Sequence, residues 1–433
     1  MDLPLANGLS WGWNEVDKNQ DAQLADIALD VKFPQHGLSP AKGDGTTDDT
    51  AAIQAIINYV KNNGGGTIFF PIGTYIITSP LLIDTHYVNL RGTGVSSKII
   101  NNGTGNAITI NPGTTVTPMF CTISDMWIVG NPSSAHGIYV TYAYNVTLRD
   151  LYLNGHGGDG VYSLFGMNSV MERVRSDENS HGFSLNQIDA GHRSTTWTLI
   201  DCYFGSNNNL GGLLSGGDSN VLIKCLFEGN KGNGLYITND EVNPNLHSCY
   251  FESNTGYSVN IDSGREGYVF GGRFADTNVS AHIQLGNTKG WLIQGTWHDG
   301  NATGGGVNIN KSYSGGVDLL VNCSLNGSTP VSGNTPNLMR INTNGISALK
   351  GISATQISAN NLRGIGKSVT ANTTSVTVTF STPEPDVNYS ITALPSWNTT
   401  YWIPGGNKTA NGFTIIFGTA SASAETFDWH LIR

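Results

Sequence analysis

Residues 199–207 read Leu199-Ile-Asp-Cys-Tyr-Phe-Gly-Ser-Asn207, and closely similar stretches follow at 222–230 and 246–254. The second reads Leu222-Ile-Lys-Cys-Leu-Phe-Glu-Gly-Asn230, and the third reads Leu246-His-Ser-Cys-Tyr-Phe-Glu-Ser-Asn254. β-Branched and aromatic residues alternate with polar ones in each copy, which is the pattern of a half-buried strand. Because a fixed period of roughly 20 to 50 residues indicates one unit stacked on itself, the repeat predicts the coils of a parallel β-helix.

The repeat also predicts which side chains stack. Equivalent residues of neighbouring coils lie about 4.8 Å apart, so each column of the repeat becomes a ladder. The Asn column at 207, 230 and 254 predicts an amide ladder that joins successive turns by side-chain hydrogen bonds. The Cys and Phe columns predict core stacks, with the cysteines as buried free thiols rather than disulfides or metal ligands. The register extends over roughly residues 120 to 330.

Composition agrees with a β-rich protein that has many tight turns. The chain has 433 residues, of which 55 are Gly and 12% are charged. Its net charge is −10 and it has no Lys/Arg cluster, which argues against a nucleic-acid partner and an anionic membrane surface. No apolar run approaches transmembrane length, so we expect no membrane insertion.

The N-terminal part predicts an arm and then a cap. Residues 1–31 are polar and are expected to form an N-terminal arm, and residues 32–118 to form a capping helix and the first coils. Thr47 is a suitable N-cap, followed by acidic residues. The apolar residues of the next segment then fall on one helical face, at Ile53, Ile56, Ile57 and Val60. Such a helix would cover the core that has no preceding coil.

Two neighbouring segments resemble a known family. Residues 43–54 read Gly43-Asp-Gly-Thr-Thr-Asp-Asp-Thr-Ala-Ala-Ile-Gln54, and residues 64–75 read Gly64-Gly-Gly-Thr-Ile-Phe-Phe-Pro-Ile-Gly-Thr-Tyr75. Together they resemble the opening of the pectate-lyase-like superfamily, whose members are right-handed parallel β-helices. The resemblance implies an all-β fold with regular coils over 119–330. The superfamily contains hydrolases, lyases, epimerases, bacteriophage tailspike depolymerases and non-catalytic spikes, so fold alone does not name the reaction.

The C-terminal part has a different pattern. Residues 331–366 lose the register and are interpreted as a transition segment, whereas 367–433 contain short alternating strands typical of a small β-sandwich. Residues 383–389 and 428–433 are similar to the C-terminal domains of phage tailspikes, which trimerise the spike or bind a glycan. That resemblance implies a homotrimer in a virion tail, possible baseplate attachment, and a bacterial surface polysaccharide as partner. The alternative is a secreted bacterial enzyme.

One pair of acids suggests glycoside hydrolysis. Retaining hydrolases use two carboxyl groups about 5 to 5.5 Å apart, and inverting ones use a separation of about 6.5 to 9.5 Å. Glu228 and Glu252 occupy the same outward column in successive coils, so we expect them to stack directly. Such proximity raises the pKa of one carboxyl and suits an acid and base pair. The alternative is a solvated corner beside the Asn ladder.

The long connections between coils supply further candidates. On the resemblance, the acids Asp218, Asp240, Glu241 and Asp262 would line a groove beside the strands that follow these connections. Each of them alone also suits a turn or a cap. The longest connection within the regular coils spans 186–195 and contains Asp189, His192 and Arg193. Substrate contacts are expected from four further residues, Tyr236, Trp291, Arg265 and His247.

These observations predict a tailspike-like glycoside hydrolase of a bacterial surface polysaccharide that needs no cofactor. A Ca²⁺-dependent polysaccharide lyase is the alternative, with Asp240, Glu241 and Asp262 as ligands and Arg265 as base. A third possibility is a non-catalytic adhesin that binds glycan without cleaving it.

Overall fold

A computed structural model describes residues 28–299 except 112, 114, 116 and 278, and residues 363–432 except 381 and 382. Between these ranges it describes the backbone of strands β29 (Val307–Ile309), β30 (Leu319–Leu325), β31 (Val331–Gly333) and β32 (Met339–Ile341). The chain divides into two compact units, Met1–Gly351 and Ile352–Arg433. Most of the predicted arm and of the predicted transition segment lies outside the described residues.

Helix α2 (Thr50–Asn62) covers the N-terminal end of the core, as the sequence predicts. Ile53, Ile56, Ile57 and Val60 are its buried residues. The helix begins after Asp49 rather than after Thr47, and the Asp49 side chain does not cap it. Asp49 instead accepts hydrogen bonds from the backbone N–H groups of residues 42 and 43, at 2.7 and 2.9 Å. The Gly-Asp-Gly turn is thus held by a buried carboxylate.

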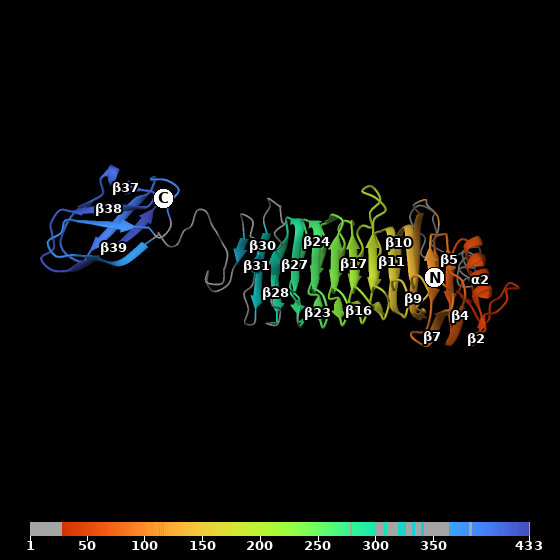
Figure 1. Ribbon diagram of the computed structural model, residues 1–433. Coiled ribbons are helices and arrows are strands. Elements are labelled where there is room, and N and C mark those ends of the chain that lie inside the picture. The colour runs from red at the N-terminus through yellow and green to blue at the C-terminus, as the bar shows by residue number, and fades with distance from the viewer. Residues whose placement is uncertain are drawn as a thin grey trace, which may run out of the picture. The chain divides into compact units, whose positions relative to one another are not determined.

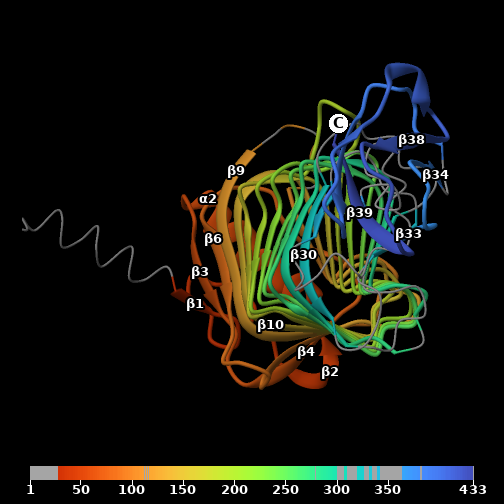
Figure 2. The ribbon, with the colours of Figure 1, turned by 90° about the vertical axis from the view of Figure 1, so that its left-hand side faces the viewer.

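The first unit is a solenoid of parallel strands, and Figures 1 and 2 show its coils side by side around one interior. Each regular coil contributes one strand to each of three faces. The first face contains β12 (Val170–Glu172), β15 (Thr198–Ile200), β18 (Val221–Ile223), β22 (Asn245–His247) and β25 (Tyr268–Phe270). The second contains β13 (Arg175–Asp177), β16 (Tyr203–Gly205), β19 (Leu226–Glu228), β23 (Tyr250–Glu252) and β26 (Arg273–Phe274). The third contains β11 (Val161–Met167), β14 (Phe183–Asn186), β17 (Gly212–Ser215), β20 (Leu235–Thr238), β24 (Val259–Arg265) and β27 (Ile283–Lys289).

Longer strands run through more than one side of a coil. These are β9 (Thr117–Val129), β10 (Ile138–Asn154) and β28 (Leu292–His298). The first coils contain β1 (Ala28–Asp30), β2 (Asp44–Asp48), β3 (Gly66–Phe69), β4 (Gly73–Ile77), β5 (Leu81–Ile83), β6 (Val88–Arg91), β7 (Ser97–Asn101) and β8 (Ile108–Ile110). Phe204 pairs in register with Phe227, and Phe227 pairs with Phe251. The predicted register is therefore confirmed.

The Cys and Phe columns lie in the core. Cys202, Cys225 and Cys249 are buried free thiols, and burial raises the pKa of the first two well above that of an exposed thiol. The rings of Phe227 and Phe251 are stacked with their centroids 4.8 Å apart. The sequence repeat predicted both columns, because equivalent positions of successive coils meet the same packing environment.

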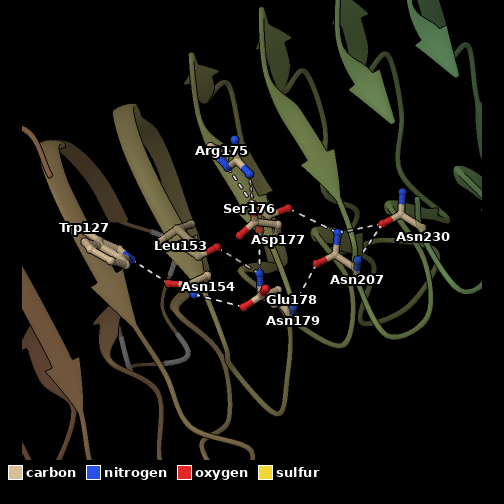
Figure 3. A network of polar contacts seen from close by, with 10 residues as sticks. All are labelled: Trp127, Leu153, Asn154, Arg175, Ser176, Asp177, Glu178, Asn179, Asn207 and Asn230. Carbon is tan, nitrogen blue, oxygen red and sulfur yellow. Dashed lines mark hydrogen bonds and ion pairs between the residues drawn. The ribbon is translucent and has the colours of Figure 1, made fainter. Parts of the chain in front are cut away.

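The predicted amide ladder is present and has a direction (Figure 3). The Nδ2 of Asn207 donates to Oδ1 of Asn230 at 2.9 Å, and Nδ2 of Asn230 donates to Oδ1 of Asn254 at 2.7 Å. Asn254 then donates to the carboxylate of Asp276 at 3.0 Å. Each amide therefore accepts from the preceding coil and donates to the next, and the series ends at a residue that accepts at both oxygens.

The aromatic column ends in a buried histidine pair, which makes the fold sensitive to acid. His298 stacks on Phe274 at 4.7 Å, and its Nδ1 lies 3.2 Å from Nδ1 of His282. Burial lowers the pKa of His298 to about 3 and lowers that of His282. The native state keeps these rings neutral, while the unfolded chain takes up protons below its ordinary histidine pKa. Stability is therefore lost progressively as the pH falls from about 6.5 towards 3.

We expect His298→Phe to reduce this acid sensitivity, because Phe continues the aromatic stack without a titrating group. Between pH 6.5 and pH 5, His298 alone costs the wild type roughly 2 kcal/mol of unfolding free energy. Urea denaturation at both pH values measures the difference, with the exposed His430→Gln as control. Equal pH dependence in wild type and His298→Phe contradicts the assignment.

The second unit is a small β-sandwich, as predicted. One sheet has the strand order β33 (Arg363–Val369), β39 (Glu425–Ile432), β35 (Ser390–Pro395). The other contains β34 (Ser375–Thr379), β38 (Gly412–Phe417), β36 (Tyr401–Trp402) and β37 (Lys408–Thr409). Its own core includes Phe413, Phe427 and Trp429. Trimerisation through this unit stays a prediction. Within the described residues, no helix has the length and apolarity to cross a membrane.

Candidate functional site

The predicted site residues lie on different parts of the coil rather than in one group. Glu228 and Glu252 lie on the second face, Tyr236 and Asp262 on the third, and His247 at the end of β22 on the first. The other predicted acids and Arg265 lie at or near the connections from third-face to first-face strands, where β21 (Glu241–Val242) is a short extra strand. A single site cannot contain them all.

Glu228 and Glu252 pair in register on neighbouring strands, as expected. The hydroxyl of Tyr250 donates to Glu252 Oε2 at 2.8 Å. Burial and the Glu228 carboxylate raise the pKa of Tyr203. Both glutamates therefore lie beside tyrosine hydroxyls on this face. A catalytic role for the pair stays a prediction.

The rest of the second face is a ladder of cations and aromatic rings. The Arg175 guanidinium lies 5.3 Å from the Tyr152 ring and 4.6 Å from the Tyr203 ring. Arg175 also pairs with Asp177 at 2.6 Å, and Trp127 Nε1 donates to Asn154 at 2.7 Å (Figure 3). Much of the ring surface on this face is covered by neighbouring side chains, so the ladder serves to join coils.

Two predicted residues are sealed in the core, and their expected surface roles are wrong. Trp291 has no exposed surface; its indole N–H donates to the Gly264 carbonyl at 3.2 Å, and its ring packs where a Cβ on Gly267 would lie. It cannot stack on a sugar at the surface. Glu241 is also fully buried and accepts hydrogen bonds from Asn220 Nδ2 and the Gly217 backbone N–H. Burial raises its pKa to about 8.

The connection between β14 and β15 holds a hydrogen-bonded Asp–His dyad. It is the yellow loop that projects beyond the coils in Figure 1. Asp189 Oδ1 lies 2.8 Å from His192 Nδ1 and also accepts the Gly191 backbone N–H at 2.8 Å. The hydrogen bond from His192 is the main cause that lowers the pKa of Asp189. The carboxylate holds one nitrogen of the imidazole, which leaves Nε2 to exchange a proton with a ligand.

Two aromatic rings and the loop backbone position His192. The His192 ring meets Phe165 edge-on at 5.0 Å and lies 6.5 Å from the Tyr142 ring. Tyr142 and Phe165 both have positive φ, 45° and 61°, at equivalent bends of their coils. The His192 side chain nevertheless keeps 48% of its surface exposed. The imidazole is therefore oriented yet accessible.

Arginines join this loop to the next coils. Arg193 Nη1 donates to the carbonyls of Gly217 at 3.3 Å and Asp240 at 3.2 Å. Arg265 pairs with the Asp240 carboxylate at 3.2 Å. Asp218 lies next to the end of the loop, where it bridges to Thr195. Arg193 thus ties the loop to two later connections, and Arg265 lies in a salt bridge with Asp240.

Unpartnered polar atoms gather on the strand that leads into the loop. Ser184 Oγ, Asn186 Nδ2 and Gln187 Oε1 are buried, and no described residue hydrogen-bonds to them. Most buried polar atoms in proteins have such partners. Ser184, Asn186 and Gln187 thus supply three of these exceptions within four consecutive residues.

Gly216 is required beside this strand. A Cβ on Gly216 would lie 2.2 Å from the Gln187 side chain, and its φ is +73°. We expect Gly216→Ala to cost roughly 1–3 kcal/mol in backbone strain and to destabilise the fold more than Gly94→Ala does, because the new Cβ also displaces Gln187. Gly94→Ala is the matched control, because φ is +82° there with nothing within 4 Å. Thermal melting measures the difference; equal melting temperatures of the two variants contradict the displacement.

The residues proposed for Ca²⁺ do not form a ligand set. Glu241 is buried among its own hydrogen-bond donors, Asp240 pairs with Arg265, and Thr238 Oγ1 lies 3.5 Å from Asp262. No group of three or more His, Cys, Asp or Glu side chains in the described part of the chain is arranged to hold a metal ion. The three carboxylates predicted as Ca²⁺ ligands, Asp240, Glu241 and Asp262, are thus not arranged around one point.

Asp189, His192 and Arg193 were found in the sequence within one long connection, but they were not predicted to be site residues. Their signal was the length of the connection at 186–195 together with three titratable side chains in it. Tyr142 and Phe165 were missed, because only the left-handed bends reveal that their side chains face this loop. No spacing in the sequence reports such a bend.

Comparison with known proteins agrees with this fold. Residues 39–120 match the family described as rhamnogalacturonase A/epimerase, pectate lyase-like. Residues 86–240 and 189–289 match the right-handed beta helix region. Among curated relatives, alginate lyase 7 from Azotobacter vinelandii is 28% identical over 191 residues, which cover 34% of this chain and 22% of that protein. The chain thus spans about a fifth of that relative.

Solved structures with the same fold come from viruses and bacteria. Geobacillus virus E2 ORF18 has a TM-score of 0.59 at 17% identity and covers 98% of this chain and 84% of its own. The A-module of mannuronan C-5 epimerase AlgE6 from Azotobacter vinelandii has a TM-score of 0.59 at 19% identity and covers 72% and 93%. The Dettilon tailspike protein has a TM-score of 0.52 at 11% identity and covers 90% and 92%. The family matches and the parallel coils together show a right-handed parallel β-helix whose first coils are similar to the pectate-lyase-like family.

Proposed function

We propose that this protein processes a uronate-containing polysaccharide by proton transfer at His192. The single observation that carries the proposal is the Asp189–His192 hydrogen bond of 2.8 Å beside Arg193, on a loop that projects from the solenoid. The names of the relatives, an alginate lyase and a mannuronan epimerase, support polysaccharide as the substrate class. This replaces hydrolysis by Glu228 and Glu252 as the preferred chemistry.

The residues have complementary roles in such a reaction. Arg193 would neutralise the uronate carboxylate, which makes the neighbouring C5–H bond more acidic. His192 Nε2, with Nδ1 held by Asp189, would take the C5 proton as general base. In a lyase the electron pair then forms a C4–C5 double bond while the C4–O4 bond breaks, and O4 leaves with a proton taken from water. In an epimerase water returns a proton to C5 from the opposite side, and His192 releases its proton to solvent.

A retaining hydrolase is the second candidate. Glu228 and Glu252 are paired on adjacent strands, whose spacing of about 4.8 Å is close to the carboxyl separation in retaining enzymes. Their half-buried position beside tyrosine hydroxyls is compatible with this role. Glu228 and Glu252, rather than the Asp189–His192 dyad, would then catalyse the reaction.

The biological setting is part of the proposal. Likeness to tailspike proteins supports a virion tail location, a bacterial surface polysaccharide as target and a parallel homotrimer. A secreted bacterial enzyme is the alternative. Light scattering distinguishes the trimer from a 46.1 kDa monomer.

Incubation with alginate, polymannuronate and neutral capsular glycans tests the chemistry. A lyase gives fragments with a 4,5-double bond, seen by ultraviolet absorbance and mass spectrometry. An epimerase incorporates deuterium at C5 in heavy water without shortening the chain. Fragments with one added water favour Glu228 and Glu252, and binding without any product assigns the protein as an adhesin. Parallel reactions with EDTA test the calcium requirement.

A further inference from the structure

We propose that Glu241, which is buried close to the loop that carries the dyad, is a positioning residue that fixes Arg193 for a uronate carboxylate. The inference rests on the proposed function and extends it, because it says what holds Arg193 in place. Glu241 is fully buried and offers no surface to a ligand, so it acts through the groups that it holds.

The carboxyl group of Glu241 fixes the equivalent connection of the preceding coil. It accepts hydrogen bonds from the Gly217 backbone N–H and from Asn220 Nδ2, the latter at 2.8 Å. A Cβ on Gly217 would lie 2.9 Å from Glu241 Oε1, so the backbone approaches the carboxyl group as closely as glycine allows. The segment at 217–220 therefore has little freedom to move while Glu241 is in place.

Arg193 is held by the two segments that Glu241 joins. Its Nη1 donates to the Gly217 carbonyl at 3.3 Å and to the Asp240 carbonyl at 3.2 Å. Gly217 is the residue whose N–H the Glu241 carboxyl group accepts, and Asp240 directly precedes Glu241 in the chain. The Val242 N–H also donates to the Gly217 carbonyl at 3.0 Å, which joins the two backbones directly. Both acceptors of the guanidinium thus depend on the position of Glu241.

A second route leads from Glu241 to the C-terminal end of the loop. Asn220 Nδ2, which faces Glu241, also donates to the Ser194 carbonyl at 3.2 Å. Asn220 Oδ1 accepts the Trp197 backbone N–H at 3.0 Å. Ser194 directly follows Arg193, so one buried amide holds the chain on that side of the arginine. Loss of the Glu241 carboxyl group therefore loosens Arg193 from two directions.

These contacts leave the charge of Arg193 to a substrate. Its Nε donates to the Ala190 carbonyl at 3.2 Å, and its Nη1 donates to the two carbonyls named above. Carbonyl groups carry no net charge, so they orient the guanidinium without neutralising it. Burial raises the pKa of Glu241 to about 8, so at pH 7 this neighbour is uncharged as well. Nη2 is then the donor that would meet the uronate carboxylate.

The test compares two ligands at pH 7 in the His192→Gln background, where binding is measured without turnover. One is mannuronate hexasaccharide, and the other is its carboxyl-reduced counterpart, in which each carboxylate is replaced by a hydroxymethyl group. The ratio of the two affinities measures recognition of the carboxylate, because a general loosening of the fold lowers both affinities alike. We expect Glu241→Gln to lower this ratio about tenfold, since its amide group cannot accept from both N–H groups.

Asp276→Asn is the matched control. Asp276 is another buried carboxylate that accepts from a buried Asn side chain and a backbone N–H, both of Asn254. It lies between β26 and β27, outside the segments that hold Arg193. Its substitution removes a similar buried acceptor and leaves the affinity ratio unchanged.

A double-mutant cycle tests whether Glu241 acts through Arg193. Arg193→Gln removes the guanidinium and lowers the ratio at least as far as Glu241→Gln does. We expect Glu241→Gln to have no further effect on the ratio when Arg193→Gln is already present. Additive effects of the two substitutions overturn the inference, because Glu241 then acts by another route, and an unchanged ratio in Glu241→Gln alone overturns it too.

The outcomes also separate this inference from the proposed function. Equal binding of the two hexasaccharides by the His192→Gln protein, together with no conversion of polymer by the wild type, overturns both. Conversion by the wild type with an unchanged ratio in Glu241→Gln overturns the inference alone. Where Glu241→Gln melts below Asp276→Asn, Glu241→Asp repeats the test, because its side chain is one methylene too short to reach both donors. An unchanged ratio there counts equally against the inference.

Discussion

We expect His192→Gln to lower the proposed conversion of a uronate polymer by about 10²–10⁴-fold, which is the usual contribution of a positioned general base. Glutamine keeps much of the shape of the side chain but cannot take up the proton. The melting temperature stays unchanged, because the side chain is half exposed on a projecting loop. Initial rates at saturating polymer, together with thermal melting, measure both effects.

Two further variants serve as a control and as a test of the dyad. His430→Gln, at an exposed position of the C-terminal unit, retains the wild-type rate. Asp189→Asn removes the charge that holds His192 Nδ1, so we expect a smaller rate loss and a shifted pH profile. Full activity in His192→Gln contradicts the dyad and directs the search to Glu228→Gln and Glu252→Gln.

Glu241 makes the protein less stable as the pH rises from about 4.5 to 8. Its pKa is raised to about 8 by burial, so the native state keeps the proton that the unfolded chain releases near pH 4.5. The native state therefore binds more protons in this range, and the unfolding free energy falls with increasing pH. At 1.36 kcal/mol per pH unit, the total loss is roughly 3–5 kcal/mol.

Glu241→Gln removes this slope, even though its amide group replaces one of the two acceptors that face Asn220 and Gly217. Urea denaturation at pH 5, 6.5 and 8 measures the unfolding free energy of both proteins. Glu266→Gln, at an exposed acid of a neighbouring coil, is the control. An unfolding free energy that still falls with rising pH in Glu241→Gln means that another group carries this dependence.

The sequence predicted the parts of the fold that repeat. The columns of Phe204 and Asn207 recur in three successive coils, so each carries several independent signals of one environment. Helix α2 was also predictable, because its apolar face has a period of its own. Thr47 was wrongly expected to cap it, since the turn before the helix is held by the Asp49 carboxylate through backbone groups that have no sequence signature.

The candidate site was harder to predict because it does not repeat. Glu241 and Trp291 have polar or amphipathic side chains in segments without regular alternation, so their burial depends on close approach to Gly217 and Gly267. Glu228 and Glu252 were predicted to be neighbours and are, but the tyrosine hydroxyls beside them come from another column. The position of His192 depends on a single loop. The shape of that loop follows from hydrogen bonds within it and to later coils.

The direction of the amide ladder limits how this protein changes length in evolution. A coil that carries Asn accepts from one side and donates to the other, so a duplicated copy fits between two existing coils. Duplication of the coil that carries Asp276 would place one carboxylate against another, with no donor between them. Repeats can therefore be gained or lost upstream of Asp276, while the coil that carries it acts as a fixed terminus for that growth.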